Sequence, residues 1–240
     1  YPADGKSFDR NTTPWIGDMK YKDISGPNGV PDGIIDDYDK TNIGSPMPKF
    51  TFGWTNTFRY KNFDLNVFVN GSYGNKVFNY MKMRLTRMNT LWNNQLTDVN
   101  DRARLEPIEP TKTYAEGSYW YTDVNNIRVA NPSTVIPRAT LTDPNDNDAI
   151  SDRYVEDGSY LRLKNIALGY TFPKKWISKW GIENLRVYMN IQNLLTITGY
   201  DGYDPEIGAS TSDITGYVYG LDNGRYPSPT TYSFGLNLSF

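Results

Sequence analysis

The clearest pattern in the chain is a strict alternation of apolar and polar residues within separate segments. Over residues 232–240, every second position is aromatic or leucine, and the positions between are serine, glycine or asparagine. A period of two is that of a half-buried β-strand. The same alternation recurs, with few interruptions, at residues 50–60, 63–70 and 185–192. The pattern therefore predicts β-strands at these four places.

A fifth strand is predicted over residues 166–172, and a sixth, weaker strand over residues 16–24. Just before the fifth strand, Leu161 and Leu163 have the opposite phase of alternation from Ile166. A β-bulge, which inserts one extra residue into a strand, explains such a change of phase. We therefore expect a bulge near Lys164.

The predicted strands are longer than the ~5–6 residues usual in soluble sheets, and their polar face carries Arg, Asp, Asn and Gln. Long strands with a ring-rich apolar face and a hydrophilic face are typical of a transmembrane β-barrel, with lipid outside and water inside. A soluble β-sandwich, in which the apolar face packs on a second sheet, has the same periodicity. The alternation alone does not separate these two folds.

The lengths of the connections favour the barrel. Residues 61–62 form a very short link and residues 173–182 a moderate one, whereas residues 25–49, 72–153 and 199–227 form long connections. Outer-membrane barrels have short periplasmic turns and long extracellular loops. The three long connections are therefore predicted to be extracellular loops, with the C-terminus on the periplasmic side.

Aromatic residues gather at the ends of the strands that this arrangement assigns to the periplasm. They are Tyr60, Phe63, Tyr170, Phe172 and Phe240. Rings at this level are typical of the aromatic girdle at a membrane interface.

The connection 72–153 also contains a helical pattern. Apolar residues recur there every three or four positions, at Val77, Met81, Leu85, Met88 and Trp92. This spacing predicts a short amphipathic α-helix packed on the rim of the barrel.

The composition excludes several classes of function. The 240 residues include no cysteine and no histidine, which rules out a Ser-His-Asp triad, a cysteine nucleophile, a His/Cys zinc site and disulfides within this chain. The net charge of -2 gives no basic surface, so we expect no nucleic-acid partner. No segment approaches the ~18 apolar residues of a transmembrane helix.

Eight short motifs occur along the chain in a fixed order. They are GDMKYKD (17–23), DGIIDDYD (32–39), YKNFDL (60–65), VEDGSYLRLKN (155–165), LGY (168–170), QNLLT (192–196), GYDPE (202–206) and YPSP (226–229). Each is weak alone, but together they resemble the C-terminal barrel region of the SusC/RagA family of TonB-linked outer-membrane proteins.

The resemblance implies a barrel of about 22 strands with an N-terminal plug, closed by a SusD-like surface lipoprotein. Such proteins import glycans or oligopeptides with energy delivered by TonB. The chain opens at Tyr1 without a secretory signal, and it has no segment that matches the plug or the TonB-contacting part. About six strands cannot close such a barrel, and lipid does not tolerate an open sheet edge.

We therefore expect an all-β chain that supplies the C-terminal strands of a large antiparallel transmembrane β-barrel with long extracellular loops. Its expected location is the bacterial outer membrane. Its expected partners are the rest of the barrel and plug, a SusD-like lipoprotein, TonB through the missing N-terminal part, membrane lipid, and a glycan or oligopeptide ligand.

The last residues fit the pattern of an outer-membrane assembly signal. The positions that carry this resemblance are Ser233, Gly235, Leu238 and Phe240. An edge strand that ends in an aromatic residue suits strand addition by an assembly machine. The alternative is an ordinary final strand.

The loop from Asn28 to Asp39 has the oxygen-ligand spacing of a calcium loop. With Asn28 at position 1, the candidate ligands are Asn28, Asp32, Ile34 through its carbonyl, Asp36 and Asp39, and Gly33 stands at the sharp turn. Val30 departs from the pattern, and Asp23 or Ser25 is an alternative to Asn28 as first ligand. A turn without an ion is the other interpretation.

Six aromatic residues in the predicted loops are candidates for ligand contact. They are Trp92, Tyr119, Trp120, Tyr121, Tyr200 and Tyr203. Aromatic faces suit both sugar rings and peptide side chains, although packing between loops or against the lid explains such residues equally well.

Two other classes of function stay open at this point. A soluble all-β carbohydrate-binding module would use the same Tyr and Trp residues. An enzyme would need two carboxylates at a defined separation, and neighbours such as Asp204 and Glu206 do not establish one. We expect the chain not to be an enzyme.

Overall fold

The computed structural model of the chain describes residues 13–90, 92–212 and 216–240. The chain divides into two compact units, one formed by residues 1–43 and 82–151 and the other by residues 44–81 and 152–240. Within the described ranges, no helix combines the length and the apolar character needed to cross a membrane.

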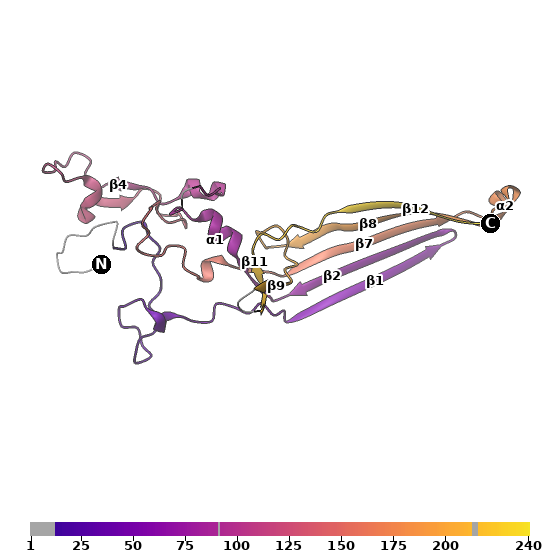
Figure 1. The fold of residues 1–240 in the computed structure, drawn as a ribbon, viewed down its shortest axis with the longest axis horizontal. Helices are drawn as coiled ribbons and strands as arrows, with labels where there is room; N and C mark the ends of the chain where they lie inside the picture. Colours follow the sequence, from indigo (N-terminus) through magenta and orange to yellow (C-terminus); the bar gives the residue numbers. More distant parts are fainter. Residues whose placement is uncertain (1–12, 91, 213–215) are drawn as a thin grey trace. The chain divides into compact units, whose positions relative to one another are not determined.

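The second unit is built on one antiparallel sheet of five long strands (Figure 1). The strands are β1 (Phe50–Tyr60), β2 (Phe63–Tyr73), β7 (Tyr160–Thr171), β8 (Asn184–Thr198) and β12 (Thr231–Ser239). They lie side by side in the order in which they follow along the chain. All five strands that the alternation predicts from residue 50 onwards are therefore confirmed, and each is longer than a typical soluble strand.

One row of side chains across the sheet is apolar on all five strands. Phe58 on β1 lies opposite Leu65 on β2, and the row continues through Leu168, Met189 and Phe234. All five side chains point to the same face, because directly opposed residues of antiparallel strands share a face. Phe58, Leu168 and Phe234 are exposed, so in the described part of the chain no second layer covers them.

The predicted bulge lies at Lys164. Phe68 pairs with Asn165 and the adjacent Val69 pairs with Leu163, so Lys164 is the extra residue of β7. The insertion returns Leu161 and Leu163 to the same face as Ile166. One continuous apolar face is the result.

The short and long connections leave opposite ends of the sheet. At one end lie the Lys61–Asn62 turn, the C-terminus, and α2 (Lys174–Ile177) followed by the 3-10 helix η6 (Ser178–Trp180) (Figure 1). Lys61 adopts the left-handed conformation, with φ 54°, which a two-residue hairpin turn requires. The short connections therefore lie at one end of the sheet and the long connections at the other, as the sequence predicted.

Three of the aromatic residues at this end of the sheet contact one another. The ring centroids of Phe63 and Tyr170 lie 4.7 Å apart, and those of Tyr170 and Phe172 lie 5.0 Å apart. Tyr60 pairs with Phe63 at the β1–β2 turn.

A small sheet lies among the residues that follow β2. It joins β3 (Lys76–Asn79) to β6 (Val155–Asp157) in antiparallel fashion and to β11 (Leu221–Asp222) in parallel. Val77 on β3 is completely buried. A separate pair, β9 (Ala209–Ser212) with β10 (Gly216–Tyr219), completes the strands of this unit.

The helix predicted from Val77 to Trp92 is shorter than expected. It is α1 (Tyr80–Thr86), while Val77 and Phe78 belong to β3. The helix prediction from apolar spacing is wrong for the first turn, because these two residues pair with β6 and β11 instead. Beyond Thr86, the carbonyl of Leu85 accepts the N–H of Leu96, which turns the chain back.

The first unit contains little regular structure. Its elements are the hairpin-like pair β4 (Leu105–Pro107) and β5 (Ile127–Val129) and the 3-10 helices η1 (Asp37–Asp39), η2 (Thr97–Asp101), η3 (Trp120–Thr122) and η4 (Val124–Asn126); η5 (Asp152–Tyr154) belongs to the other unit. Its core is formed by buried Trp15, Val99, Ala103, Ile127 and Ile136.

The sixth strand, predicted over residues 16–24, is wrong: no strand is assigned there. Gly17 has a φ of 89°, and the Asp18 carboxylate accepts the N–H of Trp15, which makes a turn. The N–H and carbonyl of Met19 bond to the side chains of Asn147 and Asn145. The backbone groups that a neighbouring strand would use are therefore occupied by side chains.

Candidate functional site

A group of four charged side chains, two buried and two half-buried, lies on the polar face of the five-stranded sheet; we call it the ionic cluster (Arg162, Lys164, Asp204 and Glu206). Nη2 of Arg162 lies 2.5 Å from Oδ1 of Asp204, and Nη1 lies 2.7 Å from Oε2 of Glu206. Nζ of Lys164 lies 2.8 Å from the same Glu206 oxygen. The cluster ties the segment that follows β8 to the polar face of β7.

Asp204 is held in its charged form. Burial on its own raises the pKa of this carboxyl, but the Arg162 guanidinium and the backbone N–H groups of Ser228 and Glu206 outweigh that effect and lower the pKa to about 2. Both of these N–H groups donate over 2.9 Å. A carboxylate that accepts several such hydrogen bonds stays ionised, so Asp204 is a fixed negative charge.

A second ion pair stands on the same face, nearer the other end of the strands. Nη2 of Arg186 lies 2.5 Å from Oδ2 of Asp64, and the pair lies over Gly169. A Cβ at Gly169 would collide with both side chains, so glycine provides the space for the pair. Two groups of paired charges therefore stand on the polar face of the sheet.

The loop aromatics Tyr119, Trp120 and Tyr121 form one small group. The rings of Tyr119 and Tyr121 are stacked, with centroids 5.0 Å apart and planes 5° apart. Trp120 meets Tyr121 edge-on at 5.8 Å. Tyr119 is exposed, and its neighbours are half-buried, so the group offers a flat ring face to solvent.

The other three aromatic candidates have different surroundings. Trp92 is fully exposed and has a φ of 67°, and Tyr203 is also exposed. Tyr200, in contrast, is buried, and its hydroxyl donates to Oδ2 of the buried Asp222 over 2.6 Å. The structure therefore shows Tyr200 packed against Asp222, and its contact with a ligand stays a prediction.

The acidic loop 28–39 uses several of its carboxylates to organise its own backbone. Asp39 accepts the N–H groups of Ile24, Ser25 and Asp36, and Asp36 accepts that of Tyr38. These hydrogen bonds lower the pKa of the Asp39 carboxyl.

Two further carboxylates, those of Asp23 and Asp32, accept backbone N–H groups of this loop. Asp32 accepts the N–H of Ile34, and Asp23 accepts that of Gly33 over 2.6 Å. Asp23, the alternative first ligand of the predicted calcium loop, thus contacts the loop through Gly33. Asn28, in contrast, is exposed.

The proposed assembly segment is strand β12, which pairs with β8. Ser233 and Gly235 point to the polar face, Leu238 lies opposite Leu185 on the apolar face, and Phe240 is exposed. A Cβ at Gly235 would overlap the ring of Tyr188 on the neighbouring strand. Glycine is needed here because an aromatic ring covers its position.

Sequence reasoning missed two groups of residues. The ionic cluster was present in the sequence only as the GYDPE motif and as a neighbouring carboxylate pair. The second group is Asp143, Asp146 and Asp148, and the spacing of Asp143, Asn145 and Asn147 was an available signal for it.

Comparison with known proteins gives matches over nearly the whole chain. No protein-family model matches it. TonB-dependent receptor P3 of Formosa agariphila is 33% identical over 98% of this chain and 21% of the receptor. TonB-dependent receptor SusC of Bacteroides thetaiotaomicron is 25% identical over 92% of this chain and 19% of the receptor.

Solved structures agree on the fold. The RagAB peptide importer in its closed-closed state aligns with a TM-score of 0.61 at 23% identity, over 90% of this chain and 20% of that chain. The RagAB peptide transporter aligns with a TM-score of 0.58 at 24% identity, over 82% of this chain and 18% of that one.

The chain spans about a fifth of the length of the receptors it matches. The sheet therefore has the fold of a part of such a receptor. The resemblance drawn from the motifs is confirmed: over nearly all of its length, this chain is similar to a segment of the TonB-dependent receptors of the SusC/RagA kind.

Proposed function

We propose that the chain forms part of the barrel wall of a TonB-dependent importer in the bacterial outer membrane. The observation that carries the proposal is the single-layer sheet with one exposed apolar face and one charged face. Its exposed rings include Trp54, Phe58, Tyr232 and Phe234. An apolar surface of this extent is not stable in water, whereas acyl chains cover it in a membrane.

The rest of the barrel and the plug complete the wall in this proposal. Strands β1 and β12 are the edges of the five-stranded sheet, and both edges need further strands because lipid cannot satisfy their backbone groups. The long connections 25–49, 72–153 and 199–227 then face the cell exterior, and Phe240 lies on the periplasmic side.

A soluble carbohydrate-binding module is the weaker alternative. Such a module buries its apolar face against a second sheet. Over the described residues of the second unit, the row that contains Phe58 and Phe234 meets no such layer.

Catalysis by paired carboxylates is also disfavoured. Asp204 and Glu206, the pair considered above, are held by Arg162 and Lys164. A carboxylate with a pKa of about 2 is a poor proton donor or acceptor near neutral pH. Their role is to fix the chain that follows β8.

For the cargo we propose a glycan or an oligopeptide, captured with a SusD-like surface lipoprotein and moved with energy from TonB. RagAB is a peptide importer, and SusC is a TonB-dependent receptor. The stacked Tyr119 and Tyr121, with Trp120, Trp92 and Tyr203, are the proposed contacts, because ring faces suit either cargo.

Two further proposals rest on sequence spacing. The loop 28–39 is proposed to hold Ca2+, with Asn28 or Asp23 as first ligand. Strand β12, through Ser233, Gly235, Leu238 and Phe240, is proposed to carry the assembly signal.

The test is import by the source bacterium with and without the gene that encodes this chain. Cells receive either fluorescein-labelled maltooligosaccharides or a fluorescein-labelled tryptic peptide digest. We expect uptake of one probe to require the gene and to stop when a protonophore collapses the energy source of TonB. A free monosaccharide that enters through porins is the control and should be taken up equally by both strains.

Equal uptake of both probes in the two strains would contradict the proposal. Purification of the complete receptor from detergent-solubilised outer membrane tests the partner: a co-purifying lipoprotein supports the lid. Recovery of the receptor from the soluble fraction would contradict its location.

A further inference from the structure

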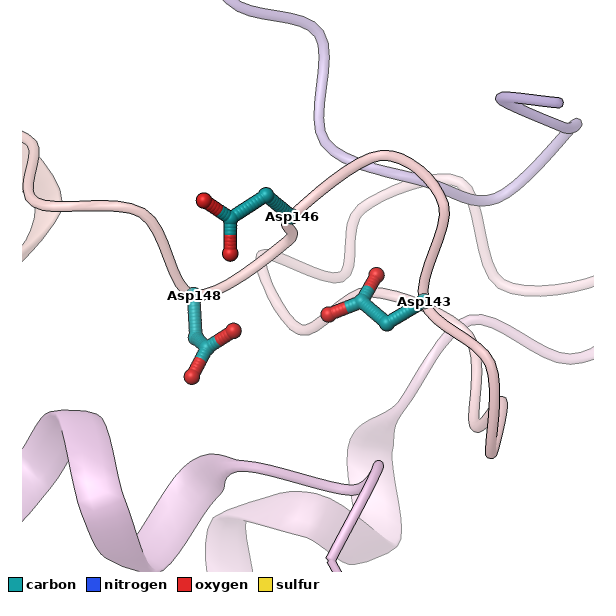
Figure 2. Close-up of side chains that lie close together, drawn as sticks. All are labelled: Asp143, Asp146 and Asp148. Atoms are coloured by element: carbon teal, nitrogen blue, oxygen red, sulfur yellow. The ribbon is translucent and has the colours of Figure 1, made fainter. Parts of the chain in front are cut away.

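Three aspartates of one loop bring their carboxylates together in the first unit. One oxygen of each of Asp143, Asp146 and Asp148 lies within 4.8 Å of the other two (Figure 2). Over residues 13–90, 92–212 and 216–240, this is the one group of three carboxylates that meets this limit. We call it the aspartate triad.

The loop that carries the triad has a defined shape. Asp143 and Asp146 both have positive φ values, 39° and 52°. The Asn147 side chain donates to Oδ1 of Asp143 over 2.6 Å, and the Asn89 side chain donates to Oδ2 over 3.0 Å. These bonds hold the Asp143 carboxylate in place.

A second observation, independent of the clustering of the carboxylates, indicates that the triad binds an ion: the surroundings of Asp148. Its side chain is only 9% exposed, and Oδ2 lies 2.7 Å from Nε of Arg87. Oδ1 is buried and has no hydrogen-bond partner. A buried carboxylate oxygen without a partner is costly, and Figure 2 shows the carboxylates of Asp148 and Asp143 turned toward the space between them. A positive ion in that space would supply the missing contact.

The side chains of the site carry a net charge of -2. Three carboxylates contribute -3, and Arg87 contributes +1, which leaves -2. A divalent cation balances the remaining charge.

The ligand set suits Ca2+. Calcium binds oxygen at 2.3–2.6 Å, so two oxygens on one ion are separated by at most about 5 Å, and the three oxygens lie close enough to share one ion. Magnesium binds at 2.0–2.1 Å, demands near-ideal octahedral geometry and keeps several of its waters. Calcium also tolerates irregular loop ligands.

We propose that the aspartate triad binds one Ca2+ ion, with Asp143, Asp146 and Asp148 each supplying a carboxylate oxygen. The ion would fix this loop against the segment 18–21. That segment is already attached to it through Met19 and through Tyr21, whose hydroxyl donates to the carbonyl of Asp146 over 2.5 Å. The site is separate in sequence from the loop 28–39.

The test uses the complete receptor, purified in detergent and freed of metal by chelation. Tb3+ replaces Ca2+ as a luminescent probe, and Tyr21, beside Asp146, is the sensitiser. We expect Asp146→Asn and Asp148→Asn each to weaken Tb3+ binding at least tenfold and to remove one Ca2+ per chain in equilibrium dialysis. Asp98→Asn, an exposed aspartate elsewhere in this unit, is the matched control and should bind as the wild type does.

Asp146 is exposed, so its variant should fold normally, and heat-dependent gel migration verifies this. Unchanged Tb3+ and Ca2+ binding in both triad variants overturns the proposal. So does loss of the ion in Asp39→Asn alone, since the bound ion would then lie in the loop 28–39. Binding of Mg2+ with no binding of Ca2+ overturns the identity of the cation. Because metal content is measured without any cargo, these outcomes do not depend on import.

Discussion

Arg162 on β7 and Asp204, 42 residues later, form an ion pair in which both side chains are almost fully buried, 3% and 5% exposed. Removal of one partner leaves an uncompensated buried charge, which typically costs about 3–5 kcal/mol. We therefore expect Arg162→Leu to lower the free energy of unfolding by about this amount. Urea unfolding of the complete receptor in detergent measures the change.

The matched control replaces both partners. Because an apolar pair leaves no buried charge, Arg162→Leu combined with Asp204→Leu should be less destabilising than the sum of the two single variants. Strict additivity would show that the ion pair is not coupled.

Asp204 also predicts a dependence of stability on pH. Burial alone would raise the pKa of this carboxyl, but Arg162 and two backbone N–H groups lower it from 3.8 to about 2. A lowered pKa means that the stabilisation is complete above about pH 4 and disappears as the pH falls from 4 to 2. The shift corresponds to about 2 kcal/mol. Unfolding free energies of wild type and Asp204→Asn should therefore converge over this interval, and a constant difference down to pH 2 would argue against the prediction.

The buried hydrogen bond between Tyr200 and Asp222 should contribute more to the free energy of unfolding than any contact of the exposed Tyr203. Tyr200→Phe removes the donor to a carboxylate that is 1% exposed. Loss of a partner to a buried group costs about 1–3 kcal/mol. Tyr203→Phe is the matched control, because its side chain is 66% exposed, and its unfolding free energy should equal that of the wild type. Equal effects of the two changes would contradict the packing role of Tyr200.

Much of the sheet was predictable because side chains of a strand alternate between two faces. The period of two located β1, β2, β7, β8 and β12, and its change of phase located the bulge at Lys164. These are local properties of the sequence. The pattern also correctly indicated that one face is apolar and the other polar.

What the sequence could not indicate depends on partners far away in the chain. Met19 failed to join a strand because Asn145 and Asn147, 126 and 128 residues later, take its hydrogen bonds. Val77 was assigned to a helix because its pairing with β6 is not visible locally. The ionic cluster has the same origin, since Arg162 meets Asp204 only after the chain returns from β8.

The orientation of the connections can be tested with single cysteines, since the chain has none of its own. In a receptor otherwise free of cysteine, a membrane-impermeant maleimide should label Glu116→Cys on intact cells, because this exposed residue lies in the long connection 72–153. Lys179→Cys, exposed in η6, should be labelled only after the outer membrane is permeabilised. Labelling in the reverse order would invert the topology.

The two faces of β1 predict opposite responses to the same substitution at neighbouring positions. Trp54 lies on the apolar face opposite Val69, and Thr55 lies on the polar face opposite Phe68. Arginine on the lipid side costs about 2–4 kcal/mol near the bilayer midplane, so Trp54→Arg should reduce the fraction of receptor assembled in the outer membrane, measured by heat-dependent gel migration. Thr55→Arg places its charge in the wet interior and should change stability by no more than about 0.5 kcal/mol. If Thr55→Arg were the more damaging change, the faces would be reversed, and equal damage would mean that neither face contacts lipid.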